Sequence, residues 1–558
     1  MFVKTFGCAL RGIHAIKITV EVSVSRGAMF SIVGLPDAAI KESSERIRAA
    51  VDQSGLDFPR QNIVVNLAPA DVRKEGSAFD LPIALAILAA GEKITAPELD
   101  KYIIMGELSL DGSLLPIRGA LPIALAARQE GFKNVILPAQ NALEAAVVQD
   151  INVYGTNSLL EVINFLTDNS LIQPTKVDIN SQFAYSPDNY DVDFADVKGQ
   201  PEVRRAFEIA CAGGHNILMV GPPGSGKSMM AKRVPTIMPP FTLDEALETT
   251  KIHSVAGKLR SGSQLMTVRP FRAPHHTISP VALVGGGSNP MPGEISLANN
   301  GVLFMDEFPE YSRQVLEVMR QPLEDRVITV SRAKYTIDYP AGFMLVASMN
   351  PCPCGYYTHP TRPCTCAPGA VARYKNRISG PLFDRIDIQV FIDPVPIDQL
   401  SGDAEGESSA AIRERVILAR EIQTQRFADN PGIHTNSRMN SRMIRQYCAL
   451  DNETRKVLTS AIEKFQMSAR AYDRILRVAR TIADLDYALT HPALSNDTHN
   501  KAVSENTCKR TRTVDDLSSS TRKTALAEAA QMPIKRQHIA EAISYRAMDR
   551  ASYGTTLR

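Results

Sequence analysis

The 558-residue sequence lacks several features that would place it in particular protein classes. No apolar run reaches the length of a membrane span, and the N-terminus has no basic-then-apolar signal segment, so we expect a cytoplasmic protein without membrane contact. The formal net charge is only +2, so any nucleic-acid binding must use local basic loops rather than an overall basic surface. The chain is too long for one hydrophobic core, and we expect about two to four globular domains.

Cysteine is also scarce, and four of the eight cysteines are scattered along the chain. The other four form two Cys-x-Cys pairs, which are Cys352, Cys354, Cys364 and Cys366. In a reducing compartment this clustering favours a metal over disulfides. Four thiolates at such spacing predict a structural, tetrahedral Zn²⁺ site that pins the insertion 350–368. Metal-free thiols, or His359 in place of one cysteine, are the alternatives.

The most informative stretch follows the short apolar run 216–220. Its residues are Gly221, Pro222, Pro223, Gly224, Ser225, Gly226, Lys227 and Ser228, and a helix-like segment begins at Met229. A strand, a glycine-rich turn and a helix start form a nest of backbone N–H groups that wraps polyphosphate. Lys227 is expected to reach the β- and γ-phosphates, and Ser228 to hold Mg²⁺. The sequence therefore predicts a nucleoside triphosphate site, with ATP and Mg²⁺ as ligands.

Two further strands are expected to complete this site. The apolar run 301–305 ends in Asp306, which would bind the metal through water, and Glu307, which would act as general base. The run 343–349 ends in Asn350, which we expect to orient the γ-phosphate or the attacking water. The alternative for Asn350 is a turn residue before Pro351.

The segment after the expected insertion carries arginines beyond the sheet. Arg385, in the sequence Asp-Arg-Ile-Asp, resembles the arginine finger of the chelatase and replicative-helicase clade of ring ATPases, which stabilises charge on a neighbour's nucleotide. Arg377 is the alternative, although a surface ion pair would also explain it. In the amphipathic helix expected from 468 to 485, Arg470 lies where the lid helix of this clade provides a phosphate-contacting arginine, and Arg474 is the second candidate.

Residues 327–330 and 335–338 predict a β-hairpin with the basic tip Ser331-Arg-Ala-Lys334. In a ring, such tips converge on the pore. Arg332 and Lys334, repeated in every subunit, would then follow a phosphodiester backbone without reading bases. The alternative is a solvated, charged turn.

The composition divides the chain into four parts. Residues 1–167 alternate strands (16–23, 28–33, 63–67, 102–105 and 134–137) with helices (38–54, 81–90 and 120–129), which indicates an α+β domain. Residues 168–190 are polar and rich in turn formers, and we expect a linker there. A phosphate-loop core with a parallel sheet is expected at 191–398, and a helical lid at 399–558. A polar insert at about 487–532 interrupts the lid, and we expect it to be a surface loop, with an accessory DNA contact as the alternative.

The first domain resembles the domain shared by the Lon protease and the Mg-chelatase-like family. The segment 74–80 lies where Lon carries its serine, and 115–122 lies where it carries its lysine. On this match Asp80 or Phe79 replaces the serine and Leu121 the lysine, so peptidase activity is not expected. Ser77 is then a turn or cap residue, in a domain that is structural or handles DNA.

Nearly the whole chain, except the insert, resembles the YifB/ComM family of Mg-chelatase-like AAA+ ATPases. The resemblance depends on the phosphate loop and the arginine-bearing lid, together with the segments 292–301, 320–325 and 350–355. It implies a hexameric, ATP-dependent DNA helicase that drives branch migration of recombination intermediates, notably in natural transformation. A magnesium-chelatase motor subunit is the alternative, and a Lon-like protease is a more distant one.

Overall fold

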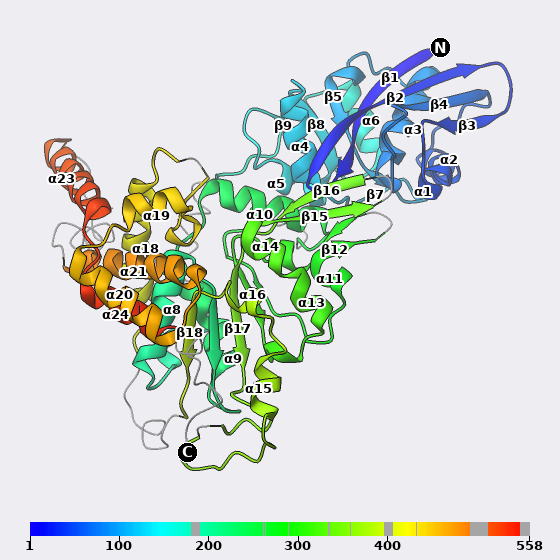
Figure 1. The fold of residues 1–558 in the computed structure, drawn as a ribbon. Helices are drawn as coiled ribbons and strands as arrows, with labels where there is room; N and C mark the ends of the chain where they lie inside the picture. Colours follow the sequence, from blue (N-terminus) through cyan, green and yellow to red (C-terminus); the bar gives the residue numbers. More distant parts are fainter. Residues whose placement is uncertain are drawn as a thin grey trace.

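The computed structural model describes residues 1–179, 190–259, 262, 264–287, 290–332, 335–357, 359–394, 406–430, 432–490 and 512–546. They form an N-terminal domain around a mixed sheet, a central domain around a parallel sheet, and a helical C-terminal domain (Figure 1). The predicted α/β multidomain class is therefore confirmed. No helix in these ranges is both long and apolar enough to cross a membrane.

The N-terminal sheet has seven strands in the order β3-β4-β2-β1-β5-β8-β9. Their bounds are β1 Phe2–Arg11, β2 His14–Ser25, β3 Phe30–Val33, β4 Asn62–Ala68, β5 Tyr102–Ile104, β8 Asn134–Pro138 and β9 Asn152–Thr156. A small hairpin joins β6 (Glu107–Leu108) to β7 (Leu114–Leu115). The helices are α1 Ala38–Lys41, α2 Ser43–Gln53, α3 Asp80–Ala90, α4 Ala120–Gln129, α5 Ala139–Ala145 and α6 Leu159–Thr167. Helix α3 is buried along its whole length, because from Leu81 onward it is apolar on every side.

The N-terminal domain differs from the predicted elements in several places. Strand β1, which pairs along its full length with β2, was not predicted, and neither was β9. The helix expected at 38–54 is two helices, because the chain turns at Glu42 between α1 and α2. The described part of the expected linker, 168–179, is attached to the fold: the Thr175 N–H donates to the Val153 carbonyl, and Val177 packs beside Phe241.

The central sheet has the strand order β11-β14-β17-β10-β18, and all its pairs are parallel. Its strands are β10 Ile217–Val220, β11 Phe271–Arg272, β14 Val302–Met305, β17 Met344–Met349 and β18 Ile388–Phe391. The larger helices are α8 Pro201–Gly213, α9 Lys227–Ile237 and α10 Leu243–Val255. The shorter ones are α11 Pro280–Val284, α12 Glu294–Leu297, α13 Arg313–Val318, α14 Arg320–Asp325, α15 Ala370–Lys375 and α16 Gly380–Phe383. Strands β10, β14 and β17 are buried along their length, as expected for a parallel sheet between layers of helices.

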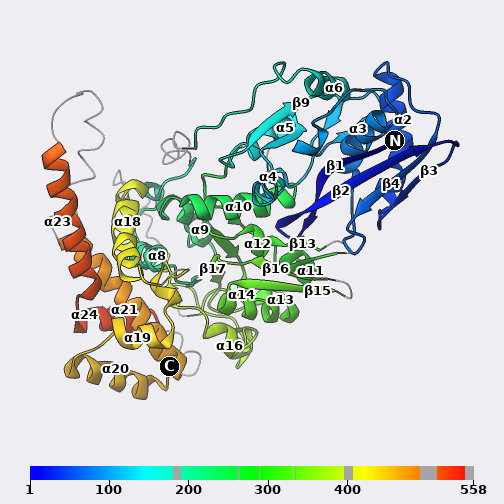
Figure 2. The ribbon, with the colours of Figure 1, turned by 90° about the horizontal axis from the view of Figure 1, so that it is seen from above.

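Two small hairpins extend from this sheet: β12 (Gly285–Gly286) pairs with β13 (Met291–Pro292), and β15 (Val327–Arg332) pairs with β16 (Tyr335–Pro340). The predicted hairpin is thus present. Ile13, in the turn between β1 and β2, packs into the same apolar cluster as Ile328 and Ile337 of the β15–β16 hairpin. Helix α10 packs against α4 of the N-terminal domain (Figure 2). The first domain therefore contacts both the hairpin and a core helix of the central domain.

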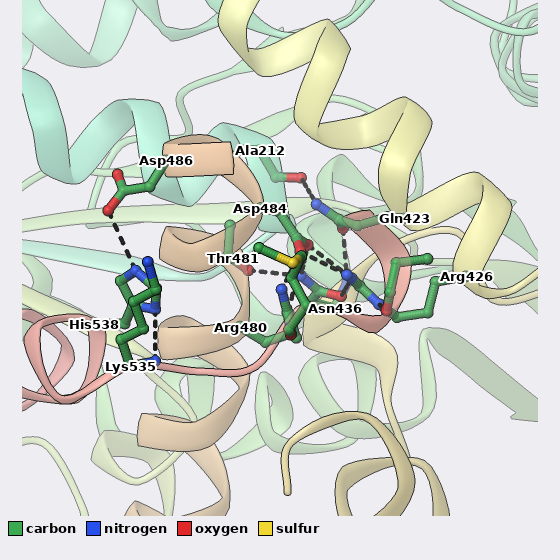
Figure 3. Close-up of polar contacts among 12 residues, drawn as sticks. Ala212, Gln423, Arg426, Asn436, Arg480, Thr481, Asp484, Asp486, Lys535 and His538 are labelled. Carbon is green, nitrogen blue, oxygen red and sulfur yellow. Dashed lines mark hydrogen bonds and ion pairs between the residues drawn. The ribbon is translucent and has the colours of Figure 1, made fainter. Parts of the chain in front are cut away.

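The C-terminal domain is helical, with α18 Ser409–Arg426, α19 Ser441–Tyr447, α20 Asn452–Phe465, α21 Ala469–Thr490, α23 Arg512–Gln531 and α24 Arg536–Ser544. A buried polar network joins α18 and α21 (Figure 3). The Asp484 carboxylate accepts hydrogen bonds from Arg426 at 2.6 and 2.7 Å, from Asn436 at 2.8 Å and from Arg480 at 3.0 Å. This network fixes the orientation of α21, which carries Arg470 at its first turn.

The loop expected for the polar insert is wrong at both ends of that segment. Residues 487–490 continue α21, and residues 512–531 form α23. Ala525 and Ala529 are buried beside Leu418 and Ile422 of α18. Residues 491–511 lie outside the described part of the chain.

Candidate active site

The predicted phosphate loop joins β10 to α9 at the carboxyl end of the central sheet. Gly224 and Gly226 have φ angles of 78° and 85°, which favour glycine. Helix α9 begins at Lys227, so the loop leads directly into a helix N-terminus, where backbone N–H groups and the helix dipole favour an anion. The Ser225 hydroxyl oxygen is buried and has no hydrogen-bond partner among the described residues. This arrangement suits a bound polyphosphate.

The Lys227 ammonium lies over the loop. Its Nζ donates to the carbonyls of Gly221 and Pro222 at 2.7 and 2.9 Å, and to Oδ1 of Asn350 at 3.3 Å. Burial lowers the pKa of Lys227, while the nearby carboxylates of Asp306 and Glu307 oppose that shift. The structure thus brings the predicted lysine and the predicted sensor Asn350 together, although they are far apart in the chain.

The two predicted carboxylates follow β14 directly. The Ser228 hydroxyl donates to Oδ2 of Asp306 at 2.7 Å, so the two proposed Mg²⁺ contacts are already neighbours. Glu307 is half-exposed and has a φ of 53°, an uncommon conformation for a residue with a side chain. The Asp306 carboxylate contacts Ser228, whereas that of Glu307 lies beside a histidine, so the two carboxylates have different neighbours.

Two side chains at this site were missed by sequence reasoning. Ser348 of β17 donates to Oδ1 of Asp306 and so orients the carboxylate that would face the metal. His276 Nδ1 lies 3.2 Å from Oε2 of Glu307. Neither residue stands at a fixed spacing from the phosphate loop. The sequence signal for His276 was its place in a pair of adjacent histidines after β11, and Ser348 had no such signal.

Arg385 and Arg470 do not lie at this end of the sheet. The Arg385 carbonyl accepts a hydrogen bond from Asn216, whose own N–H donates to Asp387 at 2.9 Å. Asn216 precedes β10, whereas Gly221 follows it, and at about 3.3 Å per residue of strand the two are about 16 Å apart. The two arginines thus lie at the amino end of the sheet, away from their own chain's phosphate loop.

A cavity of about 480 Å³ occupies that amino end, and we call it the arginine cavity. Its lining includes six arginines and four carboxylates, which are Arg326, Arg385, Arg438, Arg470, Arg474, Arg477, Glu324, Asp325, Asp387 and Asp473. Arg474 forms an ion pair with Asp387. Burial alone would raise the pKa of Asp387, but Arg474 and His215 hold that pKa far below its usual range. Burial lowers the pKa of Arg326 to about 10. The alternative finger, Arg377, pairs with Glu310 on the surface, 2.6 Å apart.

The four clustered cysteines meet in space, as predicted. Their sulfur atoms all lie within 4.8 Å of one another, and the Cys352, Cys354 and Cys364 sulfurs are 3.3 to 3.7 Å apart. Tetrahedral zinc with sulfur ligands at about 2.3 Å requires sulfur atoms about 3.8 Å apart, so the set suits that metal. His359 is not part of the cluster. A Cβ atom added to Gly355 would lie 2.6 Å from Pro223, so the cysteine loop packs directly on the phosphate loop.

The remaining predicted residues lie in the β15–β16 hairpin and in the N-terminal domain. Arg332 ends β15, but its side chain and all of Lys334 lie outside the described part of the chain. Asp80 is buried and paired with Arg46 at 2.9 Å, and burial raises its pKa to about 6 although Arg46 opposes the shift. Leu121 is buried, and Ser77 begins a short 3₁₀ helix. These positions carry no serine–lysine pair.

Comparison with known proteins matches three parts of this chain to one family. Residues 193–400 match the family described as magnesium chelatase, subunit ChlI. Residues 20–141 match subunit ChlI of Mg-chelatase, and residues 406–504 match the C-terminal part of magnesium chelatase subunit ChlI. The competence protein ComM of Haemophilus influenzae is 44% identical over 481 residues, 86% of this chain and 92% of ComM. The YifB proteins of Salmonella typhimurium and Escherichia coli, both described as uncharacterized, are each 40% identical over 545 residues, 97% of this chain and 96% of each relative.

Proposed function

Because the chain belongs to the magnesium chelatase ChlI family of AAA ATPases, together with ComM and YifB, we propose that it is a hexameric, ATP-driven DNA helicase. It acts in the cytoplasm and moves along single-stranded or branched DNA without sequence preference. Its work is branch migration of recombination intermediates, notably during natural transformation. The competence role stated in the name of ComM supports the last point.

The observation that carries the proposal is the separation of the catalytic groups. Lys227, Ser228, Asp306, Glu307 and Asn350 surround the phosphate loop, where ATP with Mg²⁺ supplies the energy of a phosphoanhydride bond. Their roles are to hold the phosphates, hold the metal, activate water and sense the γ-phosphate.

Arg385 and Arg470, in contrast, lie at the opposite end of β10, in the arginine cavity beside Asn216. Neither of these two arginines therefore reaches its own chain's phosphate loop, where Lys227 is the cation that the structure places. A neighbour that presents its arginine cavity to this phosphate loop would supply both arginines, and repetition of that contact builds a ring.

The DNA contact belongs to the β15–β16 hairpin. Its tip carries Arg332 and Lys334, and the apolar base is held by Ile328 and Ile337. A cation contributed by each subunit neutralises successive phosphates and gives affinity without base recognition. The cysteine cluster, with structural Zn²⁺, keeps the loop that packs on Pro223 in one conformation.

A magnesium-chelatase motor subunit is the second candidate, because three segments of the chain match that enzyme's ChlI subunit. The two functions use the same ATP site and differ in what stimulates it. A porphyrin with Mg²⁺ would raise the ATPase rate of a chelatase motor, and DNA would raise that of a helicase.

The deciding experiment measures the ATPase rate of the full chain with and without a single-stranded oligonucleotide, together with its mass by light scattering. The expected result is faster hydrolysis with DNA and a six-subunit assembly in the presence of ATP. A protein that stays monomeric with ATP and DNA, or whose ATPase rate does not rise with DNA, contradicts the proposal.

A second experiment tests the sharing of one site between two subunits. Arg385→Ala and Lys227→Ala are each expected to be nearly inactive alone. A mixture of the two should regain hydrolysis, because an intact phosphate loop then meets an intact arginine. Unrecovered activity in the mixture, with mixed assemblies shown to form, argues against a finger shared between subunits.

A further inference from the structure

The arginine proposed to complete a neighbour's ATP site is held by a carboxylate of its own chain. We propose that Glu324 acts as a latch that withholds Arg385 until the β15–β16 hairpin moves on DNA. Glu324 is thereby a positioning residue that makes hydrolysis depend on DNA. This inference rests on the proposed function, in which Arg385 is the finger and the hairpin contacts DNA.

The latch is an ion pair between the Glu324 carboxylate and Nη2 of Arg385. Nη1 of Arg385 donates to the Pro381 carbonyl at 2.6 Å, while Nε is buried without a hydrogen-bond partner among the described residues. The Arg385 side chain is 10% exposed and that of Glu324 is 58% exposed. The carboxylate is therefore the accessible half of the pair, and the half that can leave while Arg385 stays in place.

The same carboxylate obstructs the proposed role of Arg385. Glu324 and Arg385 line the arginine cavity together with Arg470. A guanidinium that already balances a carboxylate stabilises new negative charge less well, and the carboxylate itself repels an entering polyphosphate. Glu324 must therefore separate from Arg385 before the arginine can act fully on a neighbour's nucleotide.

The position of Glu324 in the chain links it to the hairpin. It lies in α14, one residue before the end of that helix, and β15 begins at Val327. Arg326 lies between the end of α14 and the start of β15. It has a φ of 58°, and its guanidinium donates to the Phe343 carbonyl at 2.6 Å. Only Asp325 and Arg326 thus separate the latch from the first strand of the hairpin.

The other strand of the hairpin connects to the catalytic end of the sheet. Strand β16 ends at Pro340, and β17 begins at Met344 and leads to Asn350. A displacement of the hairpin therefore acts on Glu324 through β15 and on Asn350 through β17. This connection gives DNA at the hairpin a physical path to both halves of the proposed ATP site.

The test compares Glu324→Gln with Glu317→Gln in the full chain, using a thymidine oligonucleotide of about sixty residues as the DNA. Glu317 is a matched control, because it also pairs with an arginine of the same region, Arg320, at 2.7 Å, but does not contact Arg385. Glu324→Gln is expected to raise the DNA-free ATPase rate about two- to fivefold, the range in which a partly exposed ion pair shifts an equilibrium. The rate with DNA should stay near that of the parental chain, so the stimulation by DNA falls. Glu317→Gln should change neither rate.

The double variant Glu324→Gln/Arg385→Ala tests whether the elevated DNA-free rate needs Arg385. If the latch acts through Arg385, the double variant loses the elevated DNA-free rate and matches Arg385→Ala. A DNA-free rate of Glu324→Gln at or below the parental value overturns the proposal, and so does a rise that survives the loss of Arg385. Failure of DNA to stimulate the parental chain counts against the proposed helicase and against release of the latch by DNA, whereas the DNA-free rates decide whether Glu324 restrains Arg385.

Discussion

The substitution Asp484→Asn tests whether a buried charge network stabilises the helical C-terminal domain, which the sequence predicted as the lid. The side chains of Asp484 and Arg426 are fully buried, and that of Arg480 is 1% exposed. The carboxylate is the acceptor for both guanidinium groups (Figure 3). Asparagine keeps the shape but removes the negative charge, so two buried cations lose their counter-ion.

Breaking a buried ion pair by removing one partner costs about 3–5 kcal/mol. For a cooperative unit of 150 to 250 residues, about the size of the lid with the elements it packs on, each kcal/mol lowers the melting temperature by about 2–4 °C. We therefore expect the transition of the lid to fall by about 6–20 °C. Hydrogen exchange should rise along α18 and α21 more than in the N-terminal domain, because the change is local.

Asp486→Asn is the matched control, since it makes the same substitution two residues further along the same helix. The Asp486 side chain is 33% exposed, and its partner Arg205 also pairs with Glu208 and Glu541. The expected cost is at most about 1 kcal/mol. Calorimetry and hydrogen exchange on both variants test this prediction. Equal losses of unfolding free energy in the two variants, or a loss below about 1 kcal/mol for Asp484→Asn, would refute the reasoning.

Three other predictions concern the active site and its supports. Glu307→Gln should bind ATP as tightly as the parental chain by titration calorimetry but hydrolyse it about 10²- to 10⁴-fold more slowly, and an unchanged rate would remove Glu307 as general base. Cys364→Ser should lose stoichiometric zinc when the metal is measured by mass spectrometry, whereas full retention would contradict the four-sulfur site. Asp387 has a pKa below that of the unfolded chain, so unfolding takes up a proton and its stabilisation is complete above about pH 4 and declines as the pH falls below that. Acid unfolding monitored by circular dichroism should therefore depend less on pH below about pH 4 in Asp387→Asn. An unchanged dependence of unfolding on pH in that range would contradict the stabilising role of the Arg474–Asp387 ion pair.

The phosphate loop and the acidic pair after β14 were predictable because each is a short segment with its own local signature. Glycine at positions 224 and 226 satisfies a backbone requirement, and Asp306 follows a short apolar run that is typical of a buried strand. The cysteine cluster is predictable for the same reason. Their residues are close in the sequence, so spacing alone limits where the side chains can meet.

The contacts that orient those groups were not predictable. Ser348 with Asp306, and Glu324 with Arg385, join residues that are 42 and 61 positions apart. No periodicity connects such pairs, because their meeting depends on the order of strands in the sheet. The resemblance assigned Arg385 to a neighbour's nucleotide, but spacing in the sequence did not show that Arg385 and the phosphate loop lie at opposite ends of β10.

Helix α23 was missed for an energetic reason. It contains the run Leu517-Ser-Ser-Ser-Thr521, whose residues compete for backbone hydrogen bonds and have modest helix propensity. Burial of Ala525 and Ala529 against α18, and the pair between Arg522 and Glu421 at 2.8 Å, support the helix instead. Tertiary packing therefore determines the structure of this segment, and packing is what a single sequence shows least.

The four residues of β10 separate two unlike ends of the molecule, and in the proposed ring this polarity sets how copies join. A contact between the phosphate-loop end of one copy and the arginine end of the next is head-to-tail, so a pair of molecules always leaves one end of each kind unsatisfied. Each copy added to an open chain makes one new contact, whereas the copy that closes the ring makes two. Both kinds of addition cost the translational and rotational entropy of one molecule. Assembly should thus be abrupt in concentration, with few open chains of intermediate length.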